Sequence, residues 1–255
     1  MILRWHSAGH NKLHQAVLQE DYAQIATLRE LAQIPDRWGF SPVQLAQLLG
    51  KQRELALLIP DLHAPKRQIF QEEYSLVYWP HLVFDSFALL RRVYGLCRRY
   101  WRRGRINRRH LWLGHYYARE IASGWTPPLA IRPSGIAEGQ GLFVREKLAS
   151  GAYIGEYTGW VRKDKKELDA QNSYCFEYLL GIFAASSFTI DAKYQGNLLR
   201  FANHSFRPNC EAKLLFDGRI PHVVLFAKTT ILPNTELTYD YGTPYWSCRE
   251  NPLSD

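Results

Sequence analysis

Two short runs near the C-terminus hold the side chains best suited to chemistry. The first is RFANHSFRPNC, residues 200–210, where Asn203, His204 and Ser205 stand between an apolar pair and a proline. A histidine in such a run could act as an acid, a base or a metal ligand, or could simply shape a turn. The second is ELTYDYG, residues 236–242, whose two tyrosines are spaced as in a half-buried strand. Neither run specifies a reaction by itself.

Three further motifs precede these runs in the chain. EGQGLFV places Gly139 and Gly141 before an apolar run, without the third glycine of a dinucleotide-binding fingerprint. EYTG follows at 156–159, and Tyr174 stands in YCFEY. The ordered series of five motifs resembles the SET-domain family of protein lysine methyltransferases over roughly residues 129–246. Each motif alone is compatible with several functions, whereas all five in this order narrow the choice of family.

The resemblance implies a cofactor, S-adenosylmethionine, with S-adenosylhomocysteine as its product. It implies that the backbone of residues 139–142 holds the methionine part, that the Asn203 side chain binds that part, and that the His204 backbone reads the adenine edge. Trp246 would stack on adenine, or else be a core tryptophan. The implied cofactor-binding residues are Gly139, Gln140, Gly141, Leu142, Tyr174, Arg200, Asn203, His204 and Trp246.

The resemblance also implies that Tyr241 is the catalytic tyrosine and that Tyr157 and Tyr239 wall the channel for the target lysine. Methyl transfer to an amine is an in-line displacement, so alignment supplies much of the catalysis. A tyrosine has a reference pKa of about 10 and is a poor bulk base at neutral pH, so the Tyr241 hydroxyl is expected to orient the amine. Tyrosine at position 239 favours mainly monomethylation.

The cysteines depart from the zinc-binding members of this family. Phe206 stands where many members carry a zinc-ligating cysteine, and the tail offers only Cys248. Cys210 is a candidate companion, but two thiolates do not make a structural zinc site. We therefore expect no metal, with Tyr245 and Trp246 closing the pocket instead.

The net charge of +8 is local. Residues 91–110 hold nine arginines and no acid, and the rest of the chain carries 23 basic and 24 acidic residues. This segment predicts contact with DNA through Arg91 to Arg109, a nuclear-import signal, or a solvated helix face. No run of eighteen uncharged apolar residues occurs, so we expect no membrane span, and the N-terminus lacks the apolar stretch of a signal peptide.

The N-terminal part contains two similar segments with a period of 30 residues, beginning at Asn11 and Ser41. Their helical periodicity resembles ankyrin repeats, and a plain four-helix bundle is an equal alternative. Helical patterns then cover about 81–103 and 108–123, and three prolines follow. Beyond residue 129 short β-rich runs alternate with turns: LAIR, GLFVR, YIGEYTGWV, SFTID, HVVLFAK and ELTYDY.

The expected fold class is therefore α+β: a helical region with ankyrin-like repeats, then a β-rich SET domain with a C-terminal pseudoknot. The predicted boundaries are 1–65 for the ankyrin-like region, 66–125 for a connector with the arginine-rich helix, 126–246 for the SET domain and 247–255 for the tail.

The expected function is methylation of lysine in histones or basic histone-like proteins. The absence of cysteine-rich flanks resembles bacterial SET proteins, so the expected location is the cytoplasm, or a host nucleus if the protein is a delivered effector. A catalytically idle SET fold serving as a scaffold remains the main alternative, and a hydrolase using Cys210 and His204 a weaker one. A homodimer and a monomer both stay open.

Overall fold

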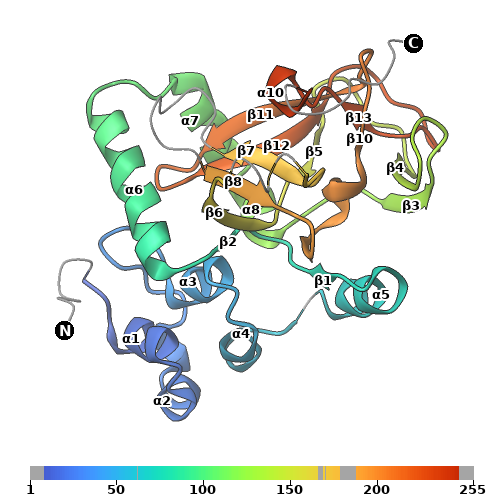
Figure 1. Cartoon of the computed structure of the whole chain (residues 1–255). Helices are drawn as coiled ribbons and strands as arrows, with labels where there is room; N and C mark the ends of the chain where they lie inside the picture. Colours follow the sequence, from blue (N-terminus) through green and yellow to red (C-terminus); the bar gives the residue numbers. More distant parts are fainter. Residues whose placement is uncertain (1–8, 62, 166–168, 170, 179–187, 247–255) are drawn as a thin grey trace.

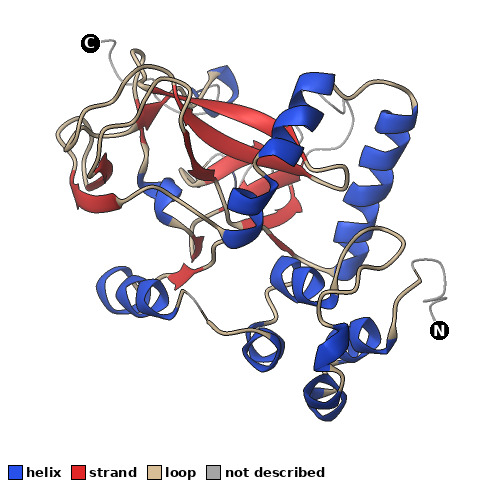
Figure 2. Ribbon diagram, turned by 180° about the vertical axis from the view of Figure 1, so that it is seen from behind, coloured by secondary structure: helices blue, strands red, loops and turns tan. Residues whose placement is uncertain are grey.

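The computed structural model describes residues 9–61, 63–165, 169, 171–178 and 188–246. Helices α1 to α5 lie along one side of several small β-sheets, and the long helix α6 rises along a second side (Figure 1). The view from behind shows the same arrangement, with the strands gathered away from the N-terminal helices (Figure 2). The expected mixture of a helical first half and a β-rich second half is confirmed.

The first four helices form two hairpins that repeat with the predicted period of 30 residues. Their N-termini are capped alike, because Asn11 and Ser41 each accept a hydrogen bond from the third helical residue in a capping box. The turns match too, since Glu20 and Gly50 both adopt positive φ, 61° and 65°. Whether the hairpins are ankyrin repeats stays a prediction. The bounds are α1 Lys12–Gln19, α2 Tyr22–Thr27, α3 Pro42–Leu48 and α4 Gln52–Leu58.

A connector joins these hairpins to the second half by strand pairing. The short helix η2 (Arg29–Leu31) lies between the two hairpins. After α5 (Ala64–Tyr74), β1 (Val77–Tyr78) pairs in parallel with β9 (Gln195–Gly196). The next strand, β2 (Val83–Phe84), pairs in parallel with β6 (Trp160–Lys163). The connector therefore contributes edge strands to sheets built mainly by the second half.

The helix predicted over residues 81–103 begins later than expected. Its apolar positions at 82 and 84 are buried, but Phe84 lies in strand β2 rather than in a helix. Helix α6 (Phe87–Arg102) starts where the Ser86 hydroxyl accepts the Leu89 amide at 3.2 Å. The prediction was wrong for residues 81–86, because a short buried strand and a helix turn give similar apolar spacing. The helix predicted for 108–123 is two helices, α7 (Arg108–Tyr116) and α8 (Ala118–Ser123).

The strands form small sheets rather than one large one. Strands β11, β12 and β5 form a three-stranded sheet, β2, β6, β8 and β7 a four-stranded one, and β3 and β4 a hairpin. The YIGEYTGWV run is broken into β5 and β6, and β7 and β11 lie outside the predicted runs. The bounds are β3 Leu129–Pro133, β4 Gln140–Val144, β5 Tyr153–Glu156, β7 Cys175–Tyr178, β8 Phe188–Asp191, β11 Cys210–Phe216 and β12 Pro221–Ala227.

The main hydrophobic core crosses the boundary predicted near residue 125. It joins Phe40 and Leu45 of the hairpin region to Val93 of α6 and to Leu142 and Leu225 of the sheets. A separate core fills the helical hairpins, and another lies under α7 and α8. The predicted domain limits stay predictions. None of the described helices is both long and apolar enough to span a bilayer.

Candidate active site

The site forms where two distant segments pair side by side. Strand β10 (Asn203–His204) pairs in parallel with β13 (Thr238–Tyr239), with Asn203 opposite Thr238 and His204 opposite Tyr239. The short helix η3 (Leu198–Phe201) leads into β10, and Asn197 caps it. The two motifs from which the sequence argument started are therefore neighbours. The threading of a pseudoknot stays a prediction.

The Asn203 amide is held in a polar network. Its Nδ2 donates to Glu236 Oε1 at 2.8 Å, to the Gln140 carbonyl at 3.1 Å and to the Ser134 hydroxyl at 3.2 Å. Glu236 also accepts from the Ser134 hydroxyl and the Gly135 amide. The side-chain nitrogen of Asn203 thus has its hydrogen-bond partners within the protein, whereas its side-chain oxygen makes no hydrogen bond with the described residues.

The glycine-rich segment supplies space for this network. Gly139 has a φ of +95°, which favours glycine, and Gln140 begins strand β4. A Cβ on Gly141 would collide with the Glu236 carboxylate. Leu142 is fully buried beneath the segment. The structure therefore brings residues 139–142 and Asn203 together, and the second glycine is needed for the close approach of Glu236.

A cluster of aromatic rings lies on the other side of β13. Tyr157 and Tyr239 are buried, and Phe176 of β7 lies between them with ring centroids 5.3 Å and 6.0 Å away. Tyr241 lies 4.8 Å from Tyr239 and donates its hydroxyl to the Ala202 carbonyl at 3.0 Å. Burial raises the pKa of all three tyrosines above the ordinary value. At neutral pH the cluster presents neutral hydroxyls and apolar walls.

His204 and Trp246 close one end of the aromatic cluster. The ring of His204 lies 4.8 Å from Trp246 and 4.6 Å from Phe206, and its Nδ1 accepts the Tyr241 amide. The contribution of His204 is therefore not confined to its backbone. Burial lowers the pKa of this imidazole, although Asp240 opposes the shift. Among the described residues, His204 Nε2 and Trp246 Nε1 are buried without a hydrogen-bond partner.

Arg200 and Tyr174 lie together, and no contact joins them to Asn203. The Arg200 guanidinium lies 3.9 Å from the Tyr174 ring centre and donates to the Ala192 and Lys193 carbonyls. Tyr174 in turn accepts the Tyr157 hydroxyl through its backbone carbonyl at 3.1 Å. In this structure the pair supports the wall of the aromatic cluster through Tyr157.

A buried charge cluster anchors the strand that ends at Tyr157. Glu156 accepts from His222 Nδ1 at 2.6 Å, and Asp217 lies 3.6 Å from the other ring nitrogen. Burial opposes the charge on His222, but Glu156 and Asp217 outweigh it and raise the pKa of His222 to about 10. The neighbouring Tyr157 amide donates to the Val223 carbonyl at 2.7 Å. The cluster thereby fixes the strand position that orients Tyr157.

Cys210 is not placed for thiolate chemistry. Cys210 is buried and donates to Asn209 Oδ1, and burial raises the pKa of its thiol to about 12. A neutral thiol without a contact to His204 is a poor nucleophile, which disfavours a hydrolase. No three potential ligands gather into a metal site among the described residues, and Cys248 lies outside them.

Comparison with known proteins shows which family this part of the chain resembles. The family model described as the SET domain matches residues 139–242. This chain is similar to SET-domain proteins over residues 139–242. Its homologues include the putative histone-lysine N-methyltransferase 1 of Plasmodium falciparum, 38% identical over 120 residues, and the human histone-lysine N-methyltransferase 2B, 36% identical over 112 residues. The matched parts cover 44% and 42% of this chain.

The relatives are much longer than the SET domain they share with this chain. The chain covers 2% of the Plasmodium protein and 4% of the human one. A solved structure, KRYPTONITE in complex with mCHH DNA, an H3(1-15) peptide and SAH, is 36% identical, with a TM-score of 0.38. The similarity covers 45% of this chain and 23% of that one.

Sequence reasoning missed three residues of the site. Glu236 and Ser134 complete the network around Asn203, and Phe176 separates Tyr157 from Tyr239. Glu236 opens the ELTYDY motif, and its carboxylate could have been singled out there. Ser134 and Phe176 carried no such signal. The Ser134 contact with Glu236 spans 102 residues, and Phe176 comes from a separate strand, β7.

Proposed function

We propose that this protein is an S-adenosylmethionine-dependent protein-lysine N-methyltransferase. The observation that carries the proposal is the β10–β13 pairing, which sets the Asn203 network beside the tyrosine cluster within the matched SET domain. The histone-lysine methyltransferase names of the relatives support the same reaction class.

The residues fit the proposed cofactor. The free carbonyl oxygen of Asn203 and the carboxylate of Glu236 suit an ammonium group, and residues 139–142 offer backbone beside them. The unpartnered nitrogens of His204 and Trp246 suit the edge of a heterocycle. When bound, S-adenosylmethionine supplies a methyl group on a sulfonium, which the substrate amine displaces.

The protein's own part in the reaction is alignment and exclusion of water. Tyr157, Phe176 and Tyr239 form apolar walls in which an amine is desolvated, and this favours the neutral amine that can attack. The raised pKa of Tyr241 keeps its hydroxyl protonated at neutral pH. We assign that hydroxyl to orient the amine rather than to remove its proton. The hydroxyl of Tyr239 occupies space among these walls that a larger methylated amine would need, and this favours monomethylation.

We further propose histones or basic histone-like proteins as substrates, with α1 to α4 as ankyrin-like repeats and the β10–β13 region as the pseudoknot. Delivery to a host nucleus as a bacterial effector, or a cytoplasmic site of action, belongs to the same proposal. The scaffold alternative is disfavoured because Asn203, His204 and Tyr241 are all present, with Asn203 and His204 in strand β10 and the Tyr241 amide donating to His204 Nδ1.

The test is incubation with radiolabelled S-adenosylmethionine and a panel of histones and other basic proteins. Wild type is compared with Tyr241→Phe and with Tyr194→Phe, whose side chain is 71% exposed and lies outside the cluster. We expect label on at least one protein, lost with Tyr241→Phe and kept with Tyr194→Phe. No label on any protein, with cofactor binding intact by calorimetry, would favour the scaffold.

A further inference from the structure

The nine arginines between residues 91 and 109 form one exposed surface. All nine side chains are exposed, and none forms an ion pair with a described carboxylate. They belong to α6, to the turn after it and to the start of α7. This arginine face consists of Arg91, Arg92, Arg98, Arg99, Arg102, Arg103, Arg105, Arg108 and Arg109.

Helix α6 presents its arginines in two parallel rows. At 100° per residue, Arg91, Arg98 and Arg102 project within about 20° of one direction. Arg92 and Arg99, extended by Arg103 at the C-cap, form a second row about 100° around the helix. The rows run along a helix about 24 Å long. The spacing is regular enough to face a partner with a repeating negative charge.

Only small residues separate the two rows. Gly95 lies at i±3 or i±4 from Arg91, Arg92, Arg98 and Arg99, and a Cβ there would meet nothing within 4 Å. The space between the rows is therefore open to a partner.

The opposite side of α6 is fully used by the core. Leu89, Leu90, Val93 and Cys97 are buried, so the helix is held in a fixed orientation. Trp101 is the large apolar side chain of α6 that stays exposed, and a single ring does not make the apolar face of a bilayer-inserting helix. Helix stabilisation does not require nine arginines, since a cation helps the helix dipole only in the last turn. The charge of the other arginines is therefore available to an external partner.

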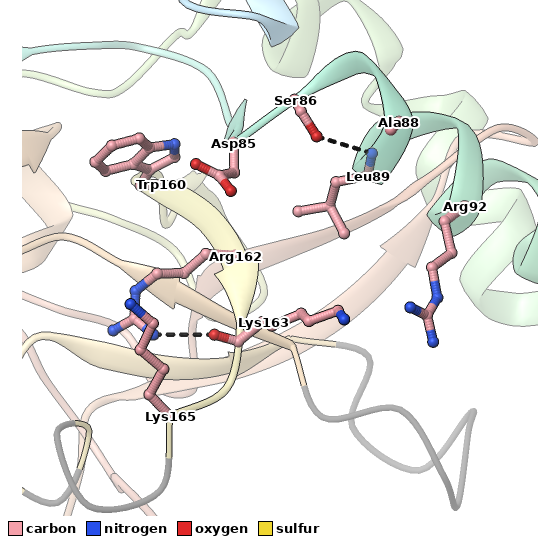
Figure 3. A pocket seen from close by; sticks show the side chains of 9 residues that line it. All are labelled: Asp85, Ser86, Ala88, Leu89, Arg92, Trp160, Arg162, Lys163 and Lys165. Carbon is pink, nitrogen blue, oxygen red and sulfur yellow. Dashed lines mark hydrogen bonds between the residues drawn. The ribbon is translucent and has the colours of Figure 1, made fainter. Parts of the chain in front are cut away.

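The basic surface continues from the second row into a cavity. Arg92 lines a cavity of about 500 Å³ between the start of α6 and β6, together with Lys163 and Lys165 (Figure 3). Lys163 extends toward Arg92 in this view. Arg162 in the same wall is neutralised by Asp169 and Asp191, so its role is structural. Asp85 is the one carboxylate among the residues that line this cavity, and it partly offsets the positive charge of Arg92, Lys163 and Lys165.

We propose that the arginine face binds the phosphate backbone of double-stranded DNA without reading its sequence. A duplex carries one negative charge per about 1.7 Å of axis, a density that two rigid rows of guanidinium groups complement. Arginine also pairs with phosphate in a bidentate manner. Phosphate contacts fix the position of a protein on the duplex without carrying sequence information, so the proposal assigns no base readout to these arginines.

The test measures binding of a fluorescent 20-base-pair duplex by anisotropy between about 50 and 200 mM salt. We expect the logarithm of affinity to fall with the logarithm of salt with a slope of about −4 to −6, as for roughly five to seven phosphate contacts. Reversal of Arg98, Arg99, Arg102 and Arg103 to Glu should lower affinity at least about 100-fold and flatten that slope.

Two matched controls separate the face from net charge. The variant with Lys12, Arg29, Lys147 and Lys228 reversed to Glu changes exposed residues elsewhere by the same total charge, and it should retain most of the affinity. Gly95→Glu places one carboxylate among four arginines and should weaken binding about tenfold, whereas Gly95→Ala should not. Equal losses from both quadruple variants would overturn the proposal.

Competing partners are distinguished in the same assay. Tighter binding to vesicles containing anionic lipid, or to a polyglutamate peptide, than to the duplex would overturn the assignment to DNA. Methyl transfer to a free protein substrate is measured in parallel for each variant. Because DNA binding is read without that reaction, failure of the proposed methyltransferase activity leaves this test unaffected.

Discussion

The tyrosine cluster and the arginine face use side chains in opposite ways. Tyr157 and Tyr239 are buried and Tyr241 is partly buried, and the hydroxyls of Tyr157 and Tyr241 donate to specific carbonyls, so the position of a single oxygen matters. The arginines are exposed and form no ion pair with any carboxylate that the structure describes, so their summed charge matters more than any one position. A single substitution should therefore be severe in the first region and mild in the second.

The largest expected effect is in the tyrosine cluster. Tyr241→Phe removes the hydroxyl that contacts the Ala202 carbonyl and that we assign to orient the amine. A misplaced amine costs about 100-fold in rate, so we expect methyl transfer to fall by at least that much. Initial rates with saturating cofactor check this. A fall of less than threefold would show that ring packing, not the hydroxyl, is what counts.

The second effect contrasts a buried charge with an exposed one. His222→Gln leaves Glu156 and Asp217 buried without their cation and should lower the free energy of unfolding by about 3 kcal/mol. Arg98→Gln should change it by less than about 0.5 kcal/mol. Urea denaturation followed by tryptophan fluorescence measures both.

The same histidine predicts a pH dependence. Its folded pKa of about 10 lies above the unfolded value, so its contribution is complete below about pH 6.5 and is lost as the pH rises through 10. Wild-type stability should therefore fall between these values, and His222→Gln should flatten the fall. A variant that keeps the full wild-type slope would refute this origin.

Two glycines offer the closest matched pair between the regions. Gly141→Ala forces the Glu236 carboxylate away from Asn203 and should weaken cofactor binding about tenfold by calorimetry. Gly95→Ala meets open space in a helix and should raise the free energy of unfolding by about 0.5–1 kcal/mol. If Gly95→Ala lowered the free energy of unfolding, or Gly141→Ala left cofactor binding unchanged, the distinction between a packed site and an open face would fail.

The smallest change concerns product number. Tyr239→Phe removes one hydroxyl from the walls and leaves the ring in contact with Phe176 and Tyr241. We expect the overall rate to change by about threefold or less, with dimethyl-lysine and trimethyl-lysine increased relative to monomethyl-lysine. Mass spectrometry of the product decides this, and an unchanged distribution would sink the steric explanation.

Local pattern was a sound guide where one segment determines its own structure. The 30-residue period and the runs LAIR and HVVLFAK appear as predicted, and Asn11 and Ser41, where the two segments begin, cap their helices. The pattern failed at residues 83 and 84, which are apolar at a spacing shared by a helix and a buried strand. Their state depends on β6, which lies far along the chain and offers the pairing edge.

The order of the motifs, the local excess of arginine and the presence of Tyr241, Asn203 and Gly141 are properties of the sequence itself. Tertiary structure decided what each residue touches: Glu236 beside Asn203, His222 between two carboxylates, and the apolar face of α6 turned into the core. The physical reason is that burial and pairing join residues remote in the chain, and these set hydrogen-bond partners and pKa values. Residue types alone do not determine which residues become neighbours.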